Sequence, residues 1–150
     1  LVILAVGKGR GSAESRLAED WIGRLPESGQ IVEIESKFPA GVNRTEDEGA
    51  RLLRALPSAS VLAILDPRGK EHSSEELAAL IGDWRDSGFT SAAFAIGGAD
   101  GHATHIRRKA RRLISFGHAT WPHMLCRVML AEQLYRASMI LAGHPYHRGN

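Results

Sequence analysis

Apolar residues recur along the chain with two different periods, and this pattern predicts strands alternating with helices. Short apolar runs predict strands at residues 1–6, 60–65, 90–96 and 113–116, and residues 30–36 alternate enough to form one more. Apolar residues at helical spacing predict helices at residues 12–25, 45–56, 73–87, 102–112 and 124–141. In the first helix the predicted apolar stripe contains Leu17, Trp21, Ile22 and Leu25. No repeat or linker interrupts this order, so we expect a single domain over residues 1–150.

Local signals mark two helix starts and one turn. Thr45 with Glu48, and Ser73 with Glu76, have the spacing of a capping box, in which each side chain caps the other's backbone N–H. Between the strand at 60–65 and Ser73, the sequence Asp-Pro-Arg-Gly-Lys at 66–70 predicts a turn.

Strands that alternate with helices predict an α/β fold, with a mostly parallel sheet and helices on both faces. In such sheets, ligands bind beyond the carboxyl ends of the strands. The loops after Leu65, Ile96 and Phe116 are therefore expected to emerge together on one edge. These loops also have unusual compositions, which makes that edge the expected functional site.

Composition changes the picture only modestly. The chain has 150 residues, of which 43% are hydrophobic and 24% charged, as in an ordinary globular protein. A single cysteine, Cys126, excludes an internal disulfide and suits a reducing compartment, so the cytoplasm is expected. The opening apolar run is too short to span a membrane, and no membrane association is expected.

Charge is distributed unevenly. Residues 1–100 contain 11 Lys and Arg against 16 Asp and Glu, whereas residues 101–150 contain 8 Lys and Arg against Glu132 alone. Much of the positive charge lies in the run 107–112, which is able to attract RNA phosphate. The alternative is a solvated helix face, the commoner role of such runs.

Two glycine-rich segments suggest a nucleotide or nucleoside ligand. Gly97, Gly98 and Gly101 allow positive φ and close approach of the backbone to a ligand, but the Gly-Lys-Ser/Thr ending of a phosphate-binding loop is missing. The segment 7–12 also follows a strand and precedes a helix, although its third glycine is out of register for a dinucleotide fingerprint.

Histidines and the cysteine leave further alternatives. His102 with His105, and His144 with His147, have a spacing able to bind one metal ion, but carboxylates near them are sparse, and no metal site is expected. A backbone hydrogen bond is the simpler role for His118 and for His123. Cys126 lies in an apolar helical stripe, which favours a structural thiol over a nucleophile.

The order of motifs resembles the bacterial ribosomal RNA large-subunit methyltransferase H family of the SPOUT superfamily. The resemblance spans nearly the whole chain. It is carried by Leu65-Asp66, by Ile96-Gly97-Gly98-x-x-Gly101, by the segment from Pro122-His123 to Arg136-Ala137, and by the terminal His144-Pro145-Tyr146-His147-Arg148. The pairing of this glycine turn with this terminus is its most specific part.

The resemblance implies a fold, a reaction and partners. It implies a SPOUT-type sheet with a C-terminal deep trefoil knot, and a homodimer whose active sites use both subunits. It further implies methyl transfer from S-adenosyl-L-methionine to N3 of a pseudouridine in 23S rRNA on the assembled 70S ribosome. Matched by position, the cofactor site comprises Leu65, Asp66, Gly97, Gly98, Gly117, His118, Ala119, Thr120, Trp121 and Pro122.

Catalytic roles are assigned to the tail. Methyl transfer requires alignment of donor and acceptor, and the N3 imide must lose its proton. We expect Arg148 to provide an electrostatic or phosphate contact, and His147 or Tyr146 to handle the proton, without an order between these two. For Arg127 and Arg136 on the last helix, a structural ion pair and a role in the active site are equally good interpretations. Two rival functions stay open at this point: a SPOUT enzyme for another RNA position, and a non-enzymatic RNA-binding protein.

Overall fold

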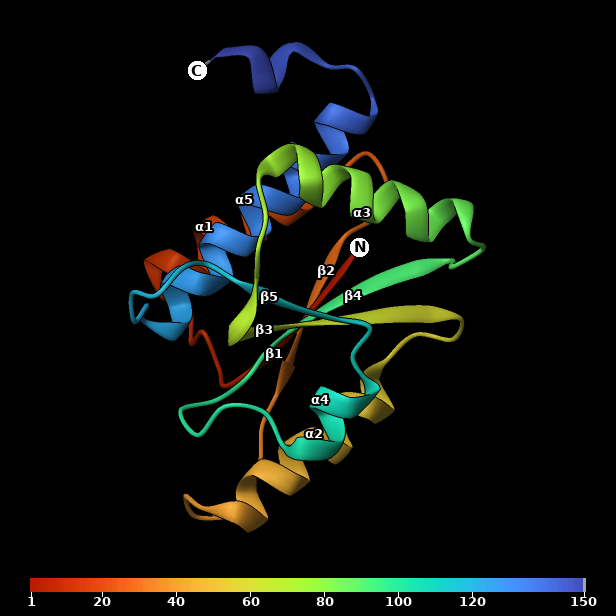
Figure 1. The fold of residues 1–150 in the computed structure, drawn as a ribbon. Coiled ribbons are helices and arrows are strands. Elements are labelled where there is room, and N and C mark those ends of the chain that lie inside the picture. The colour runs from red at the N-terminus through yellow and green to blue at the C-terminus, as the bar shows by residue number, and fades with distance from the viewer. Residues whose placement is uncertain (150) are drawn as a thin grey trace.

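The computed structural model describes residues 1–149 and contains a five-stranded parallel sheet with the strand order β2-β1-β4-β3-β5 (Figure 1). Every pairing in the sheet is parallel, which confirms the predicted α/β class. The strands are β1 (Val2–Val6), β2 (Gln30–Ile34), β3 (Ser60–Glu71), β4 (Ser91–Ile96) and β5 (Arg112–Ser115). The predicted trefoil knot stays a prediction.

Helices cover both faces of the sheet, as predicted. In Figure 1, α1, α3 and α5 lie on one face and α2 and α4 on the other. The helices are α1 (Ala13–Gly23), α2 (Val42–Ala55), α3 (Ser74–Asp86), α4 (Thr104–Lys109) and α5 (His123–Leu141), followed by the 3-10 turn η1 (Pro145–Gly149).

The alternation of side chains along each strand creates two hydrophobic cores. In β1, Ile3 and Ala5 join the core under α1, α3 and α5, whereas Val2 and Leu4 join the core under α2 and α4. Phe94 of β4 packs in the first core, where the centroid of its ring lies 6.1 Å from that of the Trp84 ring. Since successive strand residues point to opposite faces, a central strand covered on both sides is apolar throughout.

The start of α2 differs from the prediction. Its N-cap is Gly41, and Thr45 lies inside the helix, where its hydroxyl donates to the Gly41 carbonyl at 3.2 Å. Glu48 is buried and pairs with Arg44 at 3.0 Å, so the predicted Thr45–Glu48 capping box was wrong. The Ser73–Glu76 capping box is confirmed, with bonds of 3.1 and 2.9 Å.

The predicted turn at residues 66–70 was also wrong, because β3 continues through it to Glu71. Both Leu65 and Lys70 align with Ile114 of β5, so the strand is irregular between them. A Cβ on Gly69 would lie within 2.5–2.6 Å of backbone atoms of Leu113 and Ile114. The Pro and Gly that suggested a turn instead allow an irregular strand to stay in contact with β5.

The predicted apolar stripe of α1 was wrong at one position. Leu17 is 46% exposed, and the helix buries Ser15 and Ala18 together with the predicted Ile22. Small residues at this face allow α1 to pack closely against α5.

Candidate active site at the carboxyl edge of the sheet

Three strands lie side by side at the carboxyl edge of the sheet. Leu65 of β3 aligns with Ile96 at the end of β4 and with Ile114 in β5. The loops after β4 and β5 begin near this edge, but the loop predicted after Leu65 is absent, because β3 continues to Glu71.

A cleft of about 610 Å³ opens beside this edge, between β5, α1, α3 and α5. This volume lies in the range of about 300–1,000 Å³ that is typical of small-molecule sites. The cleft mixes apolar and polar side chains, and its lining consists of Trp21, Glu71, His72, Ser73, Ser74, Leu77, Ile114, Ser115, Phe116, Gly117, Val128, Met129, Glu132 and Gln133.

Of the predicted cofactor residues, Gly117 lines this cleft. Its φ of 90° is in the left-handed region that favours glycine, and its N–H donates to the Ser115 hydroxyl at 3.1 Å. The segment from His118 to Pro122 follows directly and is exposed, with the Trp121 indole N–H donating to the Phe116 carbonyl at 3.2 Å. No hydrogen bond within residues 1–149 fixes the His118 side chain.

The glycine turn lies next to the cleft-forming elements but faces another direction. A Cβ on Gly98 would lie 3.1 Å from Val6 and 3.2 Å from the Glu48 carboxylate, on the side of α2. Gly97 closely approaches the Gly101 backbone, and of these three only Gly101 has a positive φ, at 74°. Close packing rather than a left-handed backbone therefore explains Gly97 and Gly98.

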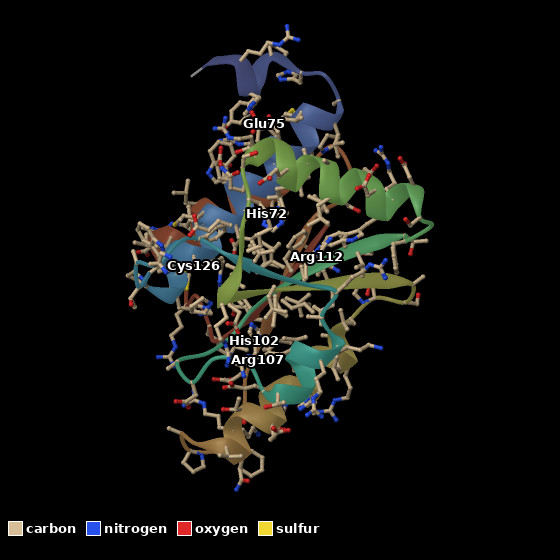
Figure 2. The ribbon with its side chains drawn as sticks, in the orientation of Figure 1. His72, Glu75, His102, Arg107, Arg112 and Cys126 are labelled. Atoms are coloured by element: carbon tan, nitrogen blue, oxygen red, sulfur yellow. The ribbon has the colours of Figure 1, made fainter. Side chains whose placement is uncertain are left out.

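Asp66 is buried in an ion-pair cluster rather than in the cleft. Its carboxylate accepts from Arg68 at 3.0 Å and from Arg107 of α4 at 2.8 Å. Although burial of the carboxyl opposes it, hydrogen bonds from these two guanidinium groups hold the pKa of Asp66 far below its usual range. Asp66 thus ties β3, just after Leu65, to Arg107 of α4. Figure 2 shows Arg107 on the face of the sheet opposite α3.

His102 lies beside this cluster and is itself buried. Burial lowers the pKa of His102 to about 4, with Arg107 adding to the effect and Asp66 opposing it. His102 is therefore neutral at pH 7.

We expect the free energy of unfolding to fall as the pH is lowered from about 6.5 to about 4. The unfolded chain protonates His102 near pH 6.5 and the folded protein near pH 4, which corresponds to about 3 kcal/mol of lost stability across this window. Above pH 6.5 the effect is absent. Urea unfolding of the wild type and of His102→Gln over this range should show a flatter pH dependence in the variant, and equal slopes would contradict the expectation.

The predicted catalytic tail packs against the rim of the cleft. The Tyr146 hydroxyl donates to Glu132, a lining residue, at 2.9 Å. His147 Nε2 lies 2.7 Å from the Glu75 carboxylate, next to Ser74, and Figure 2 shows Glu75 beside the C-terminal segment. Arg148 is exposed.

The local environment separates the two proton-handling candidates. Burial and the hydrogen bond to Glu132 raise the pKa of Tyr146. The pKa of Glu75 is lowered to about 2, because its carboxylate accepts hydrogen bonds from the Glu75 backbone N–H and from His147. His147 therefore has an ionised carboxylate at Nε2, while its Nδ1 has no hydrogen-bond partner within residues 1–149.

A second network connects α5 to β2 and to the end of β1 through Arg127, which is 1% exposed. Arg127 donates to Glu33 at 2.6 Å and to the Gly7 carbonyl at 3.1 Å, and Glu33 also accepts from the Gly9 N–H at 2.7 Å. The structural ion pair expected for Arg127 is thus present, and Arg136 likewise pairs with Glu132 at 2.8 Å.

His123 extends the Arg127 network to the glycine turn. Its Nδ1 lies 3.1 Å from the Gly97 carbonyl, so this nitrogen carries the proton, and Nε2 faces Arg127 at 3.5 Å. Burial, reinforced by Arg127, lowers the pKa of His123. The backbone hydrogen bond expected for His123 is confirmed, and it joins the end of the 117–122 loop to the end of β4.

Several lining residues escaped the sequence analysis. Ser73 was interpreted only as a helix cap, and Glu71, His72, Ser74 and Glu132 received no role in the site. The rule that ligands bind at the carboxyl ends of parallel strands also points to residues 71–74, because β3 ends at Glu71.

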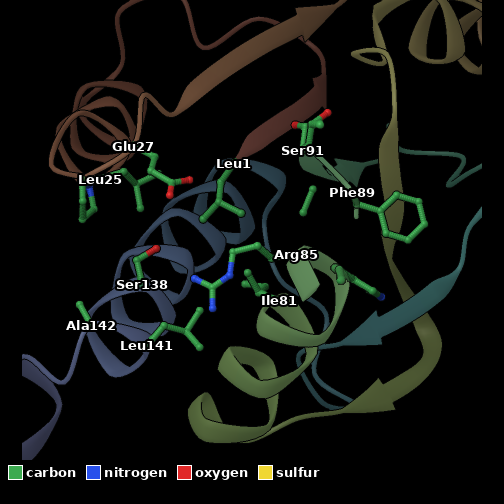
Figure 3. Close-up of a pocket in the computed structure, with 14 residues that line it drawn as sticks. Leu1, Leu25, Glu27, Ile81, Arg85, Phe89, Ser91, Ser138, Leu141 and Ala142 are labelled. Carbon is green, nitrogen blue, oxygen red and sulfur yellow. The ribbon is translucent and has the colours of Figure 1, made fainter. Parts of the chain in front are cut away.

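A second pocket, of about 220 Å³, lies at the opposite edge of the sheet (Figure 3). It is lined by Leu1 and Ser91 at the amino ends of β1 and β4, with Trp84, Phe89 and Leu141 around them. Because ligands of parallel sheets bind at the carboxyl ends, the larger cleft is the candidate active site.

Two further findings concern residues 1–149 as a whole. Within this range, three or more His, Cys, Asp or Glu residues nowhere gather in a way that would bind a metal ion. None of the helices in the described chain combines the length and the apolar character needed to cross a membrane.

A parallel α/β sheet with a mixed polar and apolar cleft at its carboxyl edge is the arrangement in which proteins of this class bind small ligands. The family model described as "Predicted SPOUT methyltransferase" matches residues 1–147. The chain belongs to the SPOUT methyltransferase family.

Relatives over nearly the full length agree with this family. A protein of Nitrobacter hamburgensis is 45% identical over 158 residues, covering 99% of each chain. One of Cereibacter sphaeroides is 48% identical over 156 residues, covering 99% of this chain and 98% of the relative. Both are named "Ribosomal RNA large subunit methyltransferase H", which confirms the resemblance found in the motifs.

Proposed function

We propose that this chain is a cytoplasmic homodimer that transfers a methyl group from S-adenosyl-L-methionine to N3 of a pseudouridine in 23S rRNA, on the assembled 70S ribosome. Membership of the SPOUT methyltransferase family over residues 1–147 is the observation that carries the proposal. The names of the full-length relatives support ribosomal RNA as the substrate.

The lining of the cleft fits this cofactor. Apolar Leu77, Phe116 and Val128 suit the adenosyl group, while Ser73 and Gln133 offer hydrogen bonds to its polar parts. The loop 117–122 begins at the cleft, where the positive φ of Gly117 lets its backbone come near a ligand. When bound, S-adenosyl-L-methionine supplies a methyl group on a sulfonium.

The chain's own residues must orient the acceptor and remove its N3 proton. The Tyr146 hydroxyl already donates a hydrogen bond to Glu132, and the pKa of Tyr146 is raised. The hydroxyl therefore stays protonated and is a poor base at neutral pH. His147 is the remaining candidate, and its Nε2 lies 2.7 Å from the Glu75 carboxylate, which holds the imidazole in place. We assign proton transfer to His147, a positioning role to Tyr146, and phosphate or electrostatic contact to Arg148.

Exposed apolar side chains support the homodimer. Trp121 is 42% exposed and Leu125 is 41% exposed, at the end of the 117–122 loop and the start of α5. A second copy covering them would bring another subunit next to the proposed cofactor loop.

The deciding experiment is methyl transfer from labelled cofactor to 70S ribosomes that lack the modification, with the nucleoside identified by mass spectrometry. We expect 3-methylpseudouridine with the wild type. His147→Asn and Arg148→Ala should each reduce kcat by about 10²-fold, typical of a lost proton-transfer or charge contact, whereas Tyr146→Phe should lose less.

Arg85→Ala is the matched control, since Arg85 is exposed and remote from the cleft, and it should leave the rate unchanged. Label in a different nucleotide would refute the substrate assignment and retain a SPOUT enzyme. Absence of transfer, with RNA binding intact, would favour the non-enzymatic RNA-binding alternative.

A further inference from the structure

Four exposed cations follow one another at the connection between α4 and β5. Arg108 and Lys109 end α4, Arg111 lies in the connection, and Arg112 begins β5. We call these four residues the basic patch. The neighbouring Arg107 differs from them, because it is half-buried and engaged by Asp66 at 2.8 Å.

The positive charge of the basic patch is not neutralised by the protein. Within residues 1–149, none of its four side chains takes part in an ion pair, and Arg111 makes a cation–π contact with Phe89 at 5.7 Å. Glu132, the only Asp or Glu in the sequence of residues 101–150, forms an ion pair with Arg136. A merely solvated face would carry both signs of charge.

Helix capping explains only part of this charge. Cations in the last turn of α4 complement the helix dipole, and Arg108 and Lys109 qualify. Arg111 and Arg112 lie beyond the helix, where the dipole gives them no role. The unpaired positive charge of the basic patch therefore indicates an anionic partner.

The basic patch lies at the start of the strand that leads to the cleft. Its last member, Arg112, and the lining residue Gly117 are five positions apart, which an extended chain spans in at most about 16 Å. With one phosphate per roughly 3.4 Å of axis on each strand, this distance corresponds to about five phosphates. Figure 2 shows Arg107 on α4 below the sheet and Arg112 at β5.

The buried Asp66–Arg107 pair fixes the patch relative to the site. Asp66 follows Leu65 at the end of the buried part of β3, and it holds α4 through Arg107. A rigid base keeps the exposed cations at a constant distance from the cleft, as a substrate-positioning surface requires.

We propose that the basic patch is a second RNA-binding surface, which binds backbone phosphates of the same RNA whose acceptor nucleotide enters the cleft. This inference rests on the proposed function for its substrate. The patch supplies affinity and register through phosphate contacts, while the cleft and the tail carry out the methyl transfer.

The test compares two triple variants on 70S ribosomes that lack the modification. The patch variant is Arg108→Gln/Lys109→Gln/Arg112→Gln, which spares Arg111 because of its contact with Phe89. The control variant, Lys37→Gln/Arg54→Gln/Arg85→Gln, removes the same charge from three exposed sites elsewhere. Circular dichroism establishes that each variant is folded.

We expect the patch variant to raise KM for ribosomes about tenfold or more near 0.1 M salt, with kcat at saturating ribosomes and cofactor Kd unchanged. The slope of log KM against log salt should become shallower by about 2–3, since each lost phosphate contact contributes about 0.7–0.9. Arg108→Lys/Arg112→Lys keeps the charge and should restore the wild-type slope.

The inference is overturned if KM and its salt slope match the wild type, if the control variant changes them equally, or if the loss lies in cofactor affinity. A wild type that methylates no ribosome would refute the proposed function instead. In that event, filter binding of the same variants to 23S rRNA decides separately: weaker binding of the patch variant alone supports the surface, and equal binding overturns it.

Discussion

Replacing Arg127 by methionine is expected to destabilise the protein by about 3 kcal/mol, the lower end of the range for breaking a buried ion pair. Methionine fills similar space but removes the donors to Glu33 and to the Gly7 carbonyl. The Glu33 side chain is 35% exposed and gains some hydration, which limits the loss. Urea unfolding at pH 7 measures the effect.

The same substitution should weaken cofactor binding more than the stability change alone explains. His123 loses its neighbour at Nε2, and the link from the 117–122 loop to the Gly97 carbonyl becomes less rigid. Calorimetric titration with S-adenosyl-L-methionine, well below the unfolding transition, separates this effect from unfolding.

Arg51→Met is the matched control for Arg127→Met. Arg51 pairs with Asp47 at 2.7 Å, but its side chain is 41% exposed, so its loss should cost less than about 1 kcal/mol. The double variant Glu33→Gln/Arg127→Met should recover part of the stability, since it removes the unpaired charge. Equal stability of Arg127→Met and wild type would show that the network is not structural.

Gly69→Ala is expected to disrupt the wall of the cleft. The added Cβ would lie 2.5–2.6 Å from the backbone of Leu113 and Ile114, which cannot move without separating β5 from β3. Overpacking of this kind costs about 1–3 kcal/mol or more. Because Ile114–Gly117 form one wall of the cleft, cofactor affinity should fall as well, by about tenfold or more for a displacement near 1 Å.

Gly23→Ala provides the control for Gly69→Ala. Gly23 ends α1, has open space around its Cα and is not in the left-handed region, so alanine should be neutral or slightly stabilising there. Thermal unfolding and cofactor titration of both variants give the comparison. A Gly69→Ala protein that binds cofactor normally would mean that β5 does not depend on the close contact.

Much of the fold followed from local patterns. Short apolar runs predicted strands where β1 and β4 lie, and the Ser73–Glu76 box marked the true start of α3. The second capping box failed because Thr45 and Glu48 satisfy the same spacing inside a helix, where Gly41 already provides the start. Spacing alone does not distinguish the two cases.

The candidate site was predicted less completely. The functional edge of the sheet followed from the alternation of strands and helices, which predicted parallel strands. Glu71 to Ser74 were missed because Pro67 and Gly69 suggested a turn. Whether a Pro-x-Gly segment turns or continues depends on a neighbouring strand, here β5, that the local sequence does not reveal.

The sequence by itself determined the alternation of strands and helices, the family motifs and the separation of charge between the two parts of the chain, since each depends on residue identity and spacing. Only the tertiary structure decided which groups meet. It paired Arg127 with Glu33 across 94 positions, buried Asp66 between Arg68 and Arg107, and left the cations of the basic patch without an ion pair among residues 1–149. These pairings depend on the register and order of strands, which burial of the sheet on both faces selects over the whole chain at once.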